Sequence, residues 1–204
     1  MGTRREFLQE GFKLAALAVA APPAFAASTP LASGPLQHID VYKLVADMHS
    51  APSRDFARTA ARMGLATHIG ESDITSLWFH DLYPRWIQQP VAIAGLTSPE
   101  SLFCLERLAW DHGMKVIYKA QHVPAHSGHV THRLTGSGQA VSQFERLYQQ
   151  NPSAWASRTA RILATFPSEP GDRLQKIVES NSADAPGWLE RPLTSWLIAP
   201  ATRG

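Results

Sequence analysis

Residues 91–121 read VAIAGLTSPESLFCLERLAWDHGMKVIYKAQ, and this stretch decides the predicted fold. Its first six residues form an uncharged apolar run, which is typical of a central strand covered on both faces. Thr97-Ser98-Pro99-Glu100 has the order of a helix start, with a hydroxyl cap, a proline in the first turn and a glutamate. The helix ends at His112-Gly113, and residues 115–119 have strand composition. The stretch therefore predicts one β-α-β unit with parallel strands.

The same alternation of strand-length and helix-length segments continues on both sides of this unit. We predict an α/β fold, a single domain over residues 39–204 with a mostly parallel, Rossmann-like or flavodoxin-like sheet flanked by helices, plus a helical C-terminal part. Pro84 is expected to end the helix that Asp73 caps. The expected strands are 41–46, 66–69, 130–134 and 193–199, and the expected helices are 53–62, 74–83, 139–149, 153–166 and 173–179.

Composition describes one ordinary globular domain. The chain has 204 residues, of which 44% are hydrophobic and 18% charged, with a formal net charge of +2. Its lysines and arginines do not cluster, so we expect no nucleic-acid partner. The single cysteine excludes an internal disulfide and a multi-thiolate metal site. We expect Cys104 to be a buried small apolar residue rather than a nucleophile.

The N-terminal segment has the parts of an export signal. It contains Thr3-Arg4-Arg5-Glu6-Phe7-Leu8, an apolar run over residues 12–21 that only Lys13 interrupts, and small residues at Ala24 and Ala26. The run is shorter than the roughly 20 apolar residues that cross a bilayer, so we expect no permanent membrane anchor. Residues 3–26 resemble the twin-arginine (Tat) signal of bacterial exported proteins.

The resemblance implies that the Tat translocase recognises residues 1–26 and exports the protein already folded, often with a cofactor inserted or a partner joined beforehand. Cleavage near Ala26 would leave a flexible leader over residues 27–38 and a periplasmic domain.

Polar residues follow the predicted strands, and in a parallel sheet the carboxyl ends of the strands face one crevice. The segment Gly95-Leu96-Thr97-Ser98 at a helix start is the best cradle for an anion, because free amides point outward there. The alternatives are solvated turns and simple helix caps at Asp73, Thr97 and Ser98. The candidate ligand-binding residues are Asp47, His49, Asp73, Gly95, Thr97, Ser98 and His122.

Four histidines within eleven residues form the candidate metal site: His122, His126, His129 and His132. Neutral imidazole is a good ligand for a transition metal such as zinc or copper, and Asp47 and His49 are plausible completing ligands. Pro124 and Gly128 argue against a helix here, so the alternative is a polar loop of partly exposed histidines.

No Walker, G-x-G-x-x-G or G-x-S-x-G pattern is present, which gives no nucleotide fingerprint and disfavours a serine hydrolase. The first hypothesis is a non-catalytic periplasmic component that binds a small anionic ligand or docks on another exported protein. The alternative is a metal-dependent periplasmic hydrolase or oxidoreductase with a His/carboxylate site and Asp47, Glu71 or Asp73 as the base. A third is an assembly partner carried alongside a cofactor enzyme.

Overall fold

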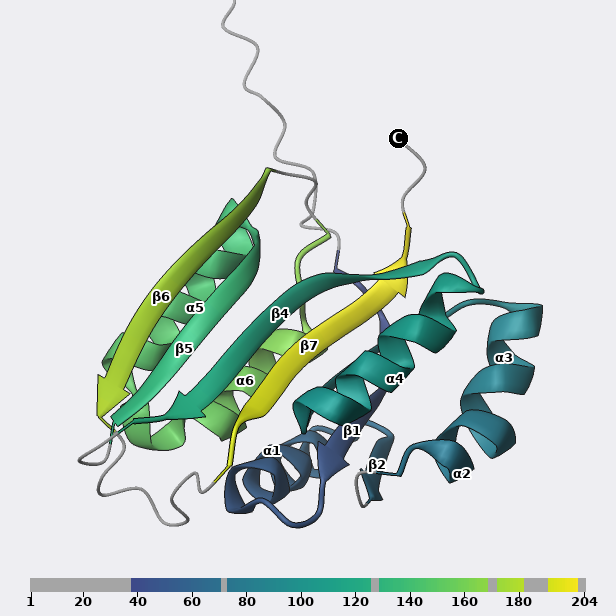
Figure 1. Ribbon diagram of the computed structural model, residues 1–204, viewed down its shortest axis with the longest axis horizontal. Helices are drawn as coiled ribbons and strands as arrows, with labels where there is room; N and C mark the ends of the chain where they lie inside the picture. Colours follow the sequence, from purple (N-terminus) through teal and green to yellow (C-terminus); the bar gives the residue numbers. More distant parts are fainter. Residues whose placement is uncertain (1–37, 71–72, 126–128, 169–171, 182–190, 202–204) are drawn as a thin grey trace, which may run out of the picture. The chain divides into compact units, whose positions relative to one another are not determined.

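A seven-stranded sheet with the order β2-β1-β3-β7-β4-β5-β6 forms the centre of the fold (Figure 1). The computed structural model describes residues 38–70, 73–125, 129–168, 172–181 and 191–201. The described elements all belong to one compact unit, residues 34–204. The strands are β1 (Val41–Asp47), β2 (Thr67–Gly70), β3 (Ala92–Thr97), β4 (Met114–Pro124), β5 (His129–Ser137), β6 (Arg173–Asn181) and β7 (Leu193–Pro200). The helices are α1 (Ala51–Arg62), α2 (Thr75–Leu77), α3 (Tyr83–Gln88), α4 (Pro99–Trp110), α5 (Gly138–Gln150) and α6 (Trp155–Ala164), with a π-helical segment η1 (Trp78–Leu82) and a 3-10 segment η3 (Pro152–Ala154).

The α/β class is confirmed, but the sheet is mixed and mostly antiparallel, so the prediction of a mostly parallel sheet is wrong. β1 pairs in parallel with β2 and with β3. The pairs β3–β7, β7–β4, β4–β5 and β5–β6 are all antiparallel. The first three strands have the 2-1-3 order of flavodoxin-like sheets. Two features cause the difference. The last strand in the chain, β7, lies between β3 and β4 and runs antiparallel to both, and the consecutive strands β4, β5 and β6 pair directly with one another in antiparallel order.

The stretch 91–121 forms the predicted strand, helix and strand, yet its two strands are not neighbours. Ser98 caps α4, since its Oγ accepts a hydrogen bond from the backbone N–H of Ser101 at 3.3 Å. Gly113 follows the helix with φ +68°, a conformation that glycine adopts without strain. β3 is buried over its whole length, as expected for an interior strand. β7 lies between β3 and β4, where Thr194 pairs with both Thr97 and Gln121.

Residues 173–181 form strand β6, so the predicted helix at 173–179 is wrong. The other two helices predicted for the C-terminal part are present as α5 and α6. Leu174, Ile177 and Val178 have a spacing of three and four residues, which imitates the apolar stripe of a helix. β5 decides the outcome, because it pairs with all nine residues of β6 without a register shift. The last two elements that the structure describes are therefore strands.

The other predicted elements are present with shifted ends. α1 begins at Ala51 after Ser50, while Ser53, the expected cap, is buried and donates its hydroxyl hydrogen bond to the carbonyl of Leu96 at 2.9 Å. Pro84 does not end the helix after Tyr83. It lies in the first turn of α3, where no backbone donor is needed, and α2, η1 and α3 follow one another as far as Gln88.

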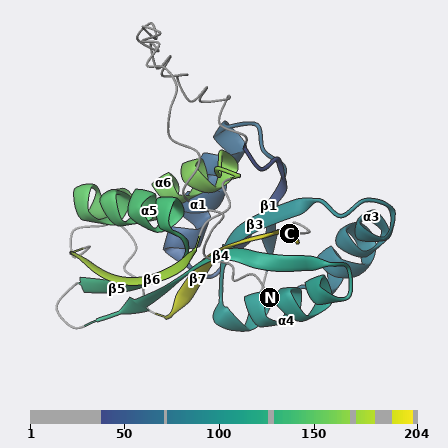
Figure 2. The same ribbon diagram turned by 90° about the horizontal axis from the view of Figure 1, so that it is seen from above.

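Helices cover the two faces of the sheet unequally. Figure 2 shows α1, α5 and α6 on one face, and α3 and α4 on the other. The core under α1, α5 and α6 extends across the sheet and includes Phe56, Phe144 and Leu197. The second core, around Trp86, Trp196 and Leu105, lies under α2, α3 and α4. Among the described elements no helix covers the second face of β5 and β6 (Figures 1 and 2).

Candidate functional site

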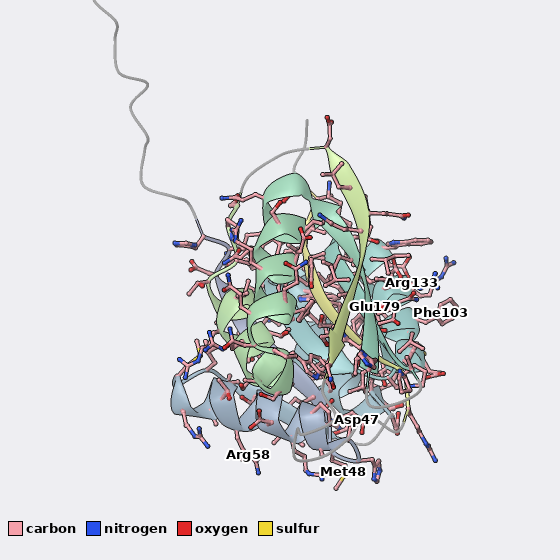
Figure 3. All side chains as sticks on the ribbon, turned by 90° about the vertical axis from the view of Figure 1, so that its left-hand side faces the viewer. Asp47, Met48, Arg58, Phe103, Arg133 and Glu179 are labelled. Atoms are coloured by element: carbon pink, nitrogen blue, oxygen red, sulfur yellow. The ribbon has the colours of Figure 1, made fainter. Side chains whose placement is uncertain are left out.

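Predicted ligand-binding residues at the ends of β1 and β2 form local turns. The carboxylate of Asp47 accepts a hydrogen bond from the backbone N–H of His49 at 2.8 Å. The exposed carboxylate of Asp73 accepts one from the backbone N–H of Thr75 at 2.8 Å and another from the Thr75 hydroxyl. These two hydrogen bonds lower the pKa of Asp73. His49 is exposed, whereas Asp47, labelled beside Met48 in Figure 3, is buried, and Glu71 lies outside the described residues.

Gly95, Thr97 and Ser98 have structural partners at the end of β3. The indole N–H of Trp196 donates a hydrogen bond to Oγ1 of the buried Thr97 at 2.9 Å. A Cβ on Gly95 would lie 2.5 Å from the Trp196 ring and 2.6 Å from the carbonyl oxygen of Val45. Trp196 therefore fills the space beside β3. The structure supports the capping alternative at Ser98, and an anion cradle there stays a prediction.

Two of the four predicted metal-binding histidines face each other inside the core. His122 of β4 and His132 of β5 are directly opposite residues of an antiparallel pair, and both are fully buried. Their Nδ1 atoms are 2.7 Å apart, a hydrogen-bonding distance. The contact requires that one ring donates its Nδ1–H and that the other accepts on a bare Nδ1. The two imidazoles must therefore be opposite tautomers.

Each histidine of this pair also forms a hydrogen bond with a serine through its Nε2 atom. Nε2 of His122 is 2.9 Å from Oγ of Ser195 on β7, and Nε2 of His132 is 2.7 Å from Oγ of Ser180 on β6. The ring that donates through Nδ1 accepts the hydroxyl hydrogen of its serine through Nε2, while the other ring donates to its serine. Four side chains from four strands thus form one hydrogen-bonded row, here called the Ser-His-His-Ser row, in which every donor points the same way.

Aromatic rings of α5 and α6 seal the Ser-His-His-Ser row from water. Tyr148 stacks on His132 with ring centroids 4.1 Å apart, and Trp155 lies 4.4 Å from His122. Burial lowers the pKa of His132 to about 3. Burial, together with the neighbouring His132, holds the pKa of His122 well below its ordinary value. Both rings are therefore neutral at the pH values where proteins usually function.

The other two histidines do not join this pair. His126 lies outside the described residues, and His129 is exposed at the start of β5. Among the residues that the structure describes, no group of three histidine, cysteine, aspartate or glutamate side chains is arranged to hold a metal ion. The row uses all four nitrogens of His122 and His132 for hydrogen bonds. Metal-dependent chemistry stays a prediction that the described residues do not support.

The sheet itself separates the two parts of the predicted crevice. Thr97 bonds to Trp196 of β7, whereas His122 bonds to Ser195, the preceding residue of the same strand. Successive residues of a strand point to opposite faces of its sheet. Thr97 and His122 therefore lie on opposite faces, and one ligand cannot contact both side chains.

The uncovered face of β4, β5 and β6 forms a hollow that the sequence-based site does not include. Its volume is about 550 Å³, which lies within the range of small-molecule sites. Lys119 of β4 and Arg133 of β5 line it from neighbouring strands, where Lys119 pairs with Thr135 and Gln121 pairs with Arg133. Figure 3 shows Arg133 projecting on the same side of the sheet as Phe103 of α4. The hollow is lined by Lys119, Gln121, Arg133, Leu134, Thr135, Arg173, Gln175, Lys176 and Ile177.

The lining has the chemistry of an anion site. It includes four cationic residues and no aspartate or glutamate, and only Lys176 has an acidic partner, Glu145 at 2.7 Å. Gln121, Gln175 and Thr135 add neutral donors beside the cations. A guanidinium such as that of Arg133 can hold a carboxylate or phosphate through two parallel hydrogen bonds.

The sequence does not reveal the hollow directly, because its cations are far apart along the chain. Lys119 and Gln121, Arg133 and Thr135, and Arg173 and Gln175 each lie two residues apart, which is the period of one strand face. This alternation was a signal for a polar sheet face. It was hidden on β6 because residues 173–179 imitate a helix.

Comparison with known proteins adds no relative, since no family model, no curated protein and no solved structure matches the chain. None of the helices in the described part of the chain is both long and apolar enough to cross a membrane.

Cys104 is exposed on α4, so the prediction that it is buried is wrong. The buried stripe of α4 consists of Leu102, Leu105 and Ala109, and Cys104 falls between these positions. Helix periodicity therefore places its thiol in solvent.

Proposed function

We propose that this protein is a non-catalytic binding protein that holds a small anionic ligand on the uncovered face of β4, β5 and β6. The observation that supports the proposal is the concentration of Lys119, Arg133 and Arg173 around one hollow with no acidic lining residue. Cations on a shared, partly enclosed surface attract an anion more strongly than scattered cations do. The chain as a whole has a formal net charge of only +2, so this local charge does not follow from composition.

The backbone of the hollow favours binding over catalysis. Its residues lie on long paired strands, β4, β5 and β6, which hold the donors at fixed spacings before a ligand arrives. Of the residues lining the hollow, none is a histidine, cysteine, serine, aspartate or glutamate, the groups that most often act as nucleophile or general base. The hollow can thus hold and orient an anion, and its lining side chains of the types that act as a base or nucleophile are limited to Lys119, Lys176 and Thr135.

The site of action that we propose is the periplasm. The twin-arginine pattern at Arg4-Arg5 supports export of the folded chain, and the ligand or another exported protein would meet it there. Sequencing the N-terminus of protein from a periplasmic fraction tests this part. We expect Ala27 as the first residue, and accumulation of the full-length cytoplasmic form when Arg4 and Arg5 are both changed to lysine.

Calorimetric titration of the mature protein with phosphate, sulfate, succinate and citrate tests the binding function. We expect at least one of these anions to bind with an affinity that falls as salt is added, because the ligand competes with salt for the same charges. The substitutions Lys119→Gln and Arg133→Gln each remove one cation of the hollow while keeping a polar side chain. Each is expected to weaken binding about tenfold or more, since a charge-assisted hydrogen bond contributes about 1.5–3 kcal/mol.

Arg62→Gln is the matched control, because Arg62 is an exposed cation at the end of α1, away from the hollow. It changes the net charge as Arg133→Gln does and is expected to leave binding unchanged. Equal losses in all three variants would show that overall charge, rather than the hollow, attracts the anion. No heat of binding with any of the four anions would count against a small-anion site.

A further inference from the structure

β6 is a long strand at the edge of the sheet. All nine of its residues pair with β5, and among the described residues no strand pairs with its other side (Figure 1). Strands in globular proteins usually have about 5–6 residues, and exposed edges are commonly protected by a proline, a bulge, a short length or charged side chains that repel a second copy. β6 has no proline, and its pairing with β5 shows no register shift. Its outer edge is therefore able to accept another strand.

The side chains of β6 are divided by charge along its length. The cations Arg173 and Lys176 lie in its first six residues, and Glu179 lies near its end. Ile177, at the middle of this pattern, is 60% exposed on the uncovered face. An antiparallel copy of the same strand would bring the cationic part of one chain beside the acidic part of the other.

We propose that two copies of this protein pair through β6, antiparallel, with Ile177 of one copy directly opposite Ile177 of the other. In this register Gln175 faces Glu179 of the second copy, and Arg173 lies diagonally from the same glutamate. Diagonal neighbours across two strands are about 7–8 Å apart, which long side chains can bridge. A two-fold axis repeats each contact, as in other isologous dimers.

Repulsion between like charges favours this register over the one whose two-fold axis lies at Lys176. A shift that places the axis at Lys176 would set two lysines directly opposite each other, and like charges at such positions destabilise a sheet. With the axis at Ile177, the two exposed isoleucines cover each other, and Lys176 keeps its partner Glu145 at 2.7 Å. The pairing joins two sheets edge to edge and removes an exposed strand edge that would otherwise promote aggregation.

Sedimentation velocity of the mature protein, over a range from about 1 µM to about 1 mM, tests this interface. We expect a reversible equilibrium between monomer and dimer. Ile177→Lys places like charges on the axis and is expected to raise the dimer dissociation constant about tenfold or more. Ile87→Lys is the matched control, because Ile87 is 59% exposed on α3, and it should leave the constant unchanged.

A charge exchange tests the register independently of folding defects. Glu179→Arg alone should weaken the dimer, since it would oppose Arg173 of the second copy, and combining it with Arg173→Glu should restore association. Circular dichroism and thermal melting confirm that each variant is folded. Wild-type protein that stays monomeric at every concentration would overturn the proposal. A dimer that neither Ile177→Lys nor Glu179→Arg weakens would also overturn it, because another surface would then form the interface.

Discussion

Acidification should destabilise this protein well before its carboxylates titrate, because the Ser-His-His-Ser row holds two neutral histidines in the core. The pKa of His132 is about 3 in the folded chain, against an ordinary value of 6.5 that applies when the chain is unfolded. The unfolded state therefore binds more protons between these two values. Stability is greatest above pH 6.5 and falls as the pH falls below it.

The size of the loss follows from the linkage between protonation and folding. Between about pH 7.5 and about pH 5, His132 alone should cost about 2 kcal/mol of unfolding free energy. His122 adds a loss of the same sign, since burial also depresses its pKa. Domains of this kind are commonly stable by about 5–15 kcal/mol, so the combined effect is a large part of the total. The cause is local: a proton on the pair would turn two N–H groups toward each other across 2.7 Å.

Urea unfolding of the mature protein at the two pH values measures this loss. His132→Asn removes the titration while its amide can still reach toward Nδ1 of His122. We expect this variant to be less stable than the wild type at the higher pH but to lose less stability on acidification. His129→Asn is the matched control, because His129 lies on the same strand with its ring exposed.

Comparison of the variants separates the pH dependence that the Ser-His-His-Ser row causes from that of other titratable groups. Burial and the nearby Lys43 lower the pKa of the half-buried His68 as well, so part of the total pH dependence comes from outside the row. The reasoning is refuted if the wild type has the same unfolding free energy at both pH values. It is refuted as well if His132→Asn loses as much stability on acidification as His129→Asn.

Two substitutions at the end of β3 test packing and capping there. Gly95→Ala should cost about 1–3 kcal/mol in urea unfolding, because the added methyl would meet the Trp196 ring at 2.5 Å and a backbone carbonyl at 2.6 Å; unchanged stability would show that the Trp196 ring moves freely. Ser98→Ala should cost about 1 kcal/mol by removing the cap of α4, whereas Ser98→Thr, which keeps a hydroxyl acceptor, should cost less.

Local sequence signals predicted the elements whose partners lie close along the chain. The helix at 99–110 follows from Ser98, Pro99 and an apolar stripe, and all of these act within one or two turns. The apolar run of β3 likewise reports burial on both faces, wherever its neighbours come from. Residues 173–181 show the limit of such signals, since their apolar spacing suits a helix and only the edge of β5 makes them a strand.

The candidate site was predictable in its residue types and not in its geometry. The density of histidines between His122 and His132 marked this segment, but spacing alone did not show that two of these rings bond to each other, and metal binding stays a prediction. Strand pairing places those two rings in contact, and Ser180 and Ser195, far away in sequence, complete the row. The cations of the hollow gave no signal along the chain, because they are distributed over three strands, β4, β5 and β6.

By itself the sequence determined the α/β class, the approximate positions of most helices and the burial of β3, because capping, turns and hydrophobic periodicity act over a few residues. Only the tertiary structure decided the direction of the strands, the insertion of β7 between β3 and β4, and the contacts of His122 and Lys119. These depend on pairing between segments up to 100 residues apart, as in Trp196 with Thr97, for which a single sequence contains no local signal.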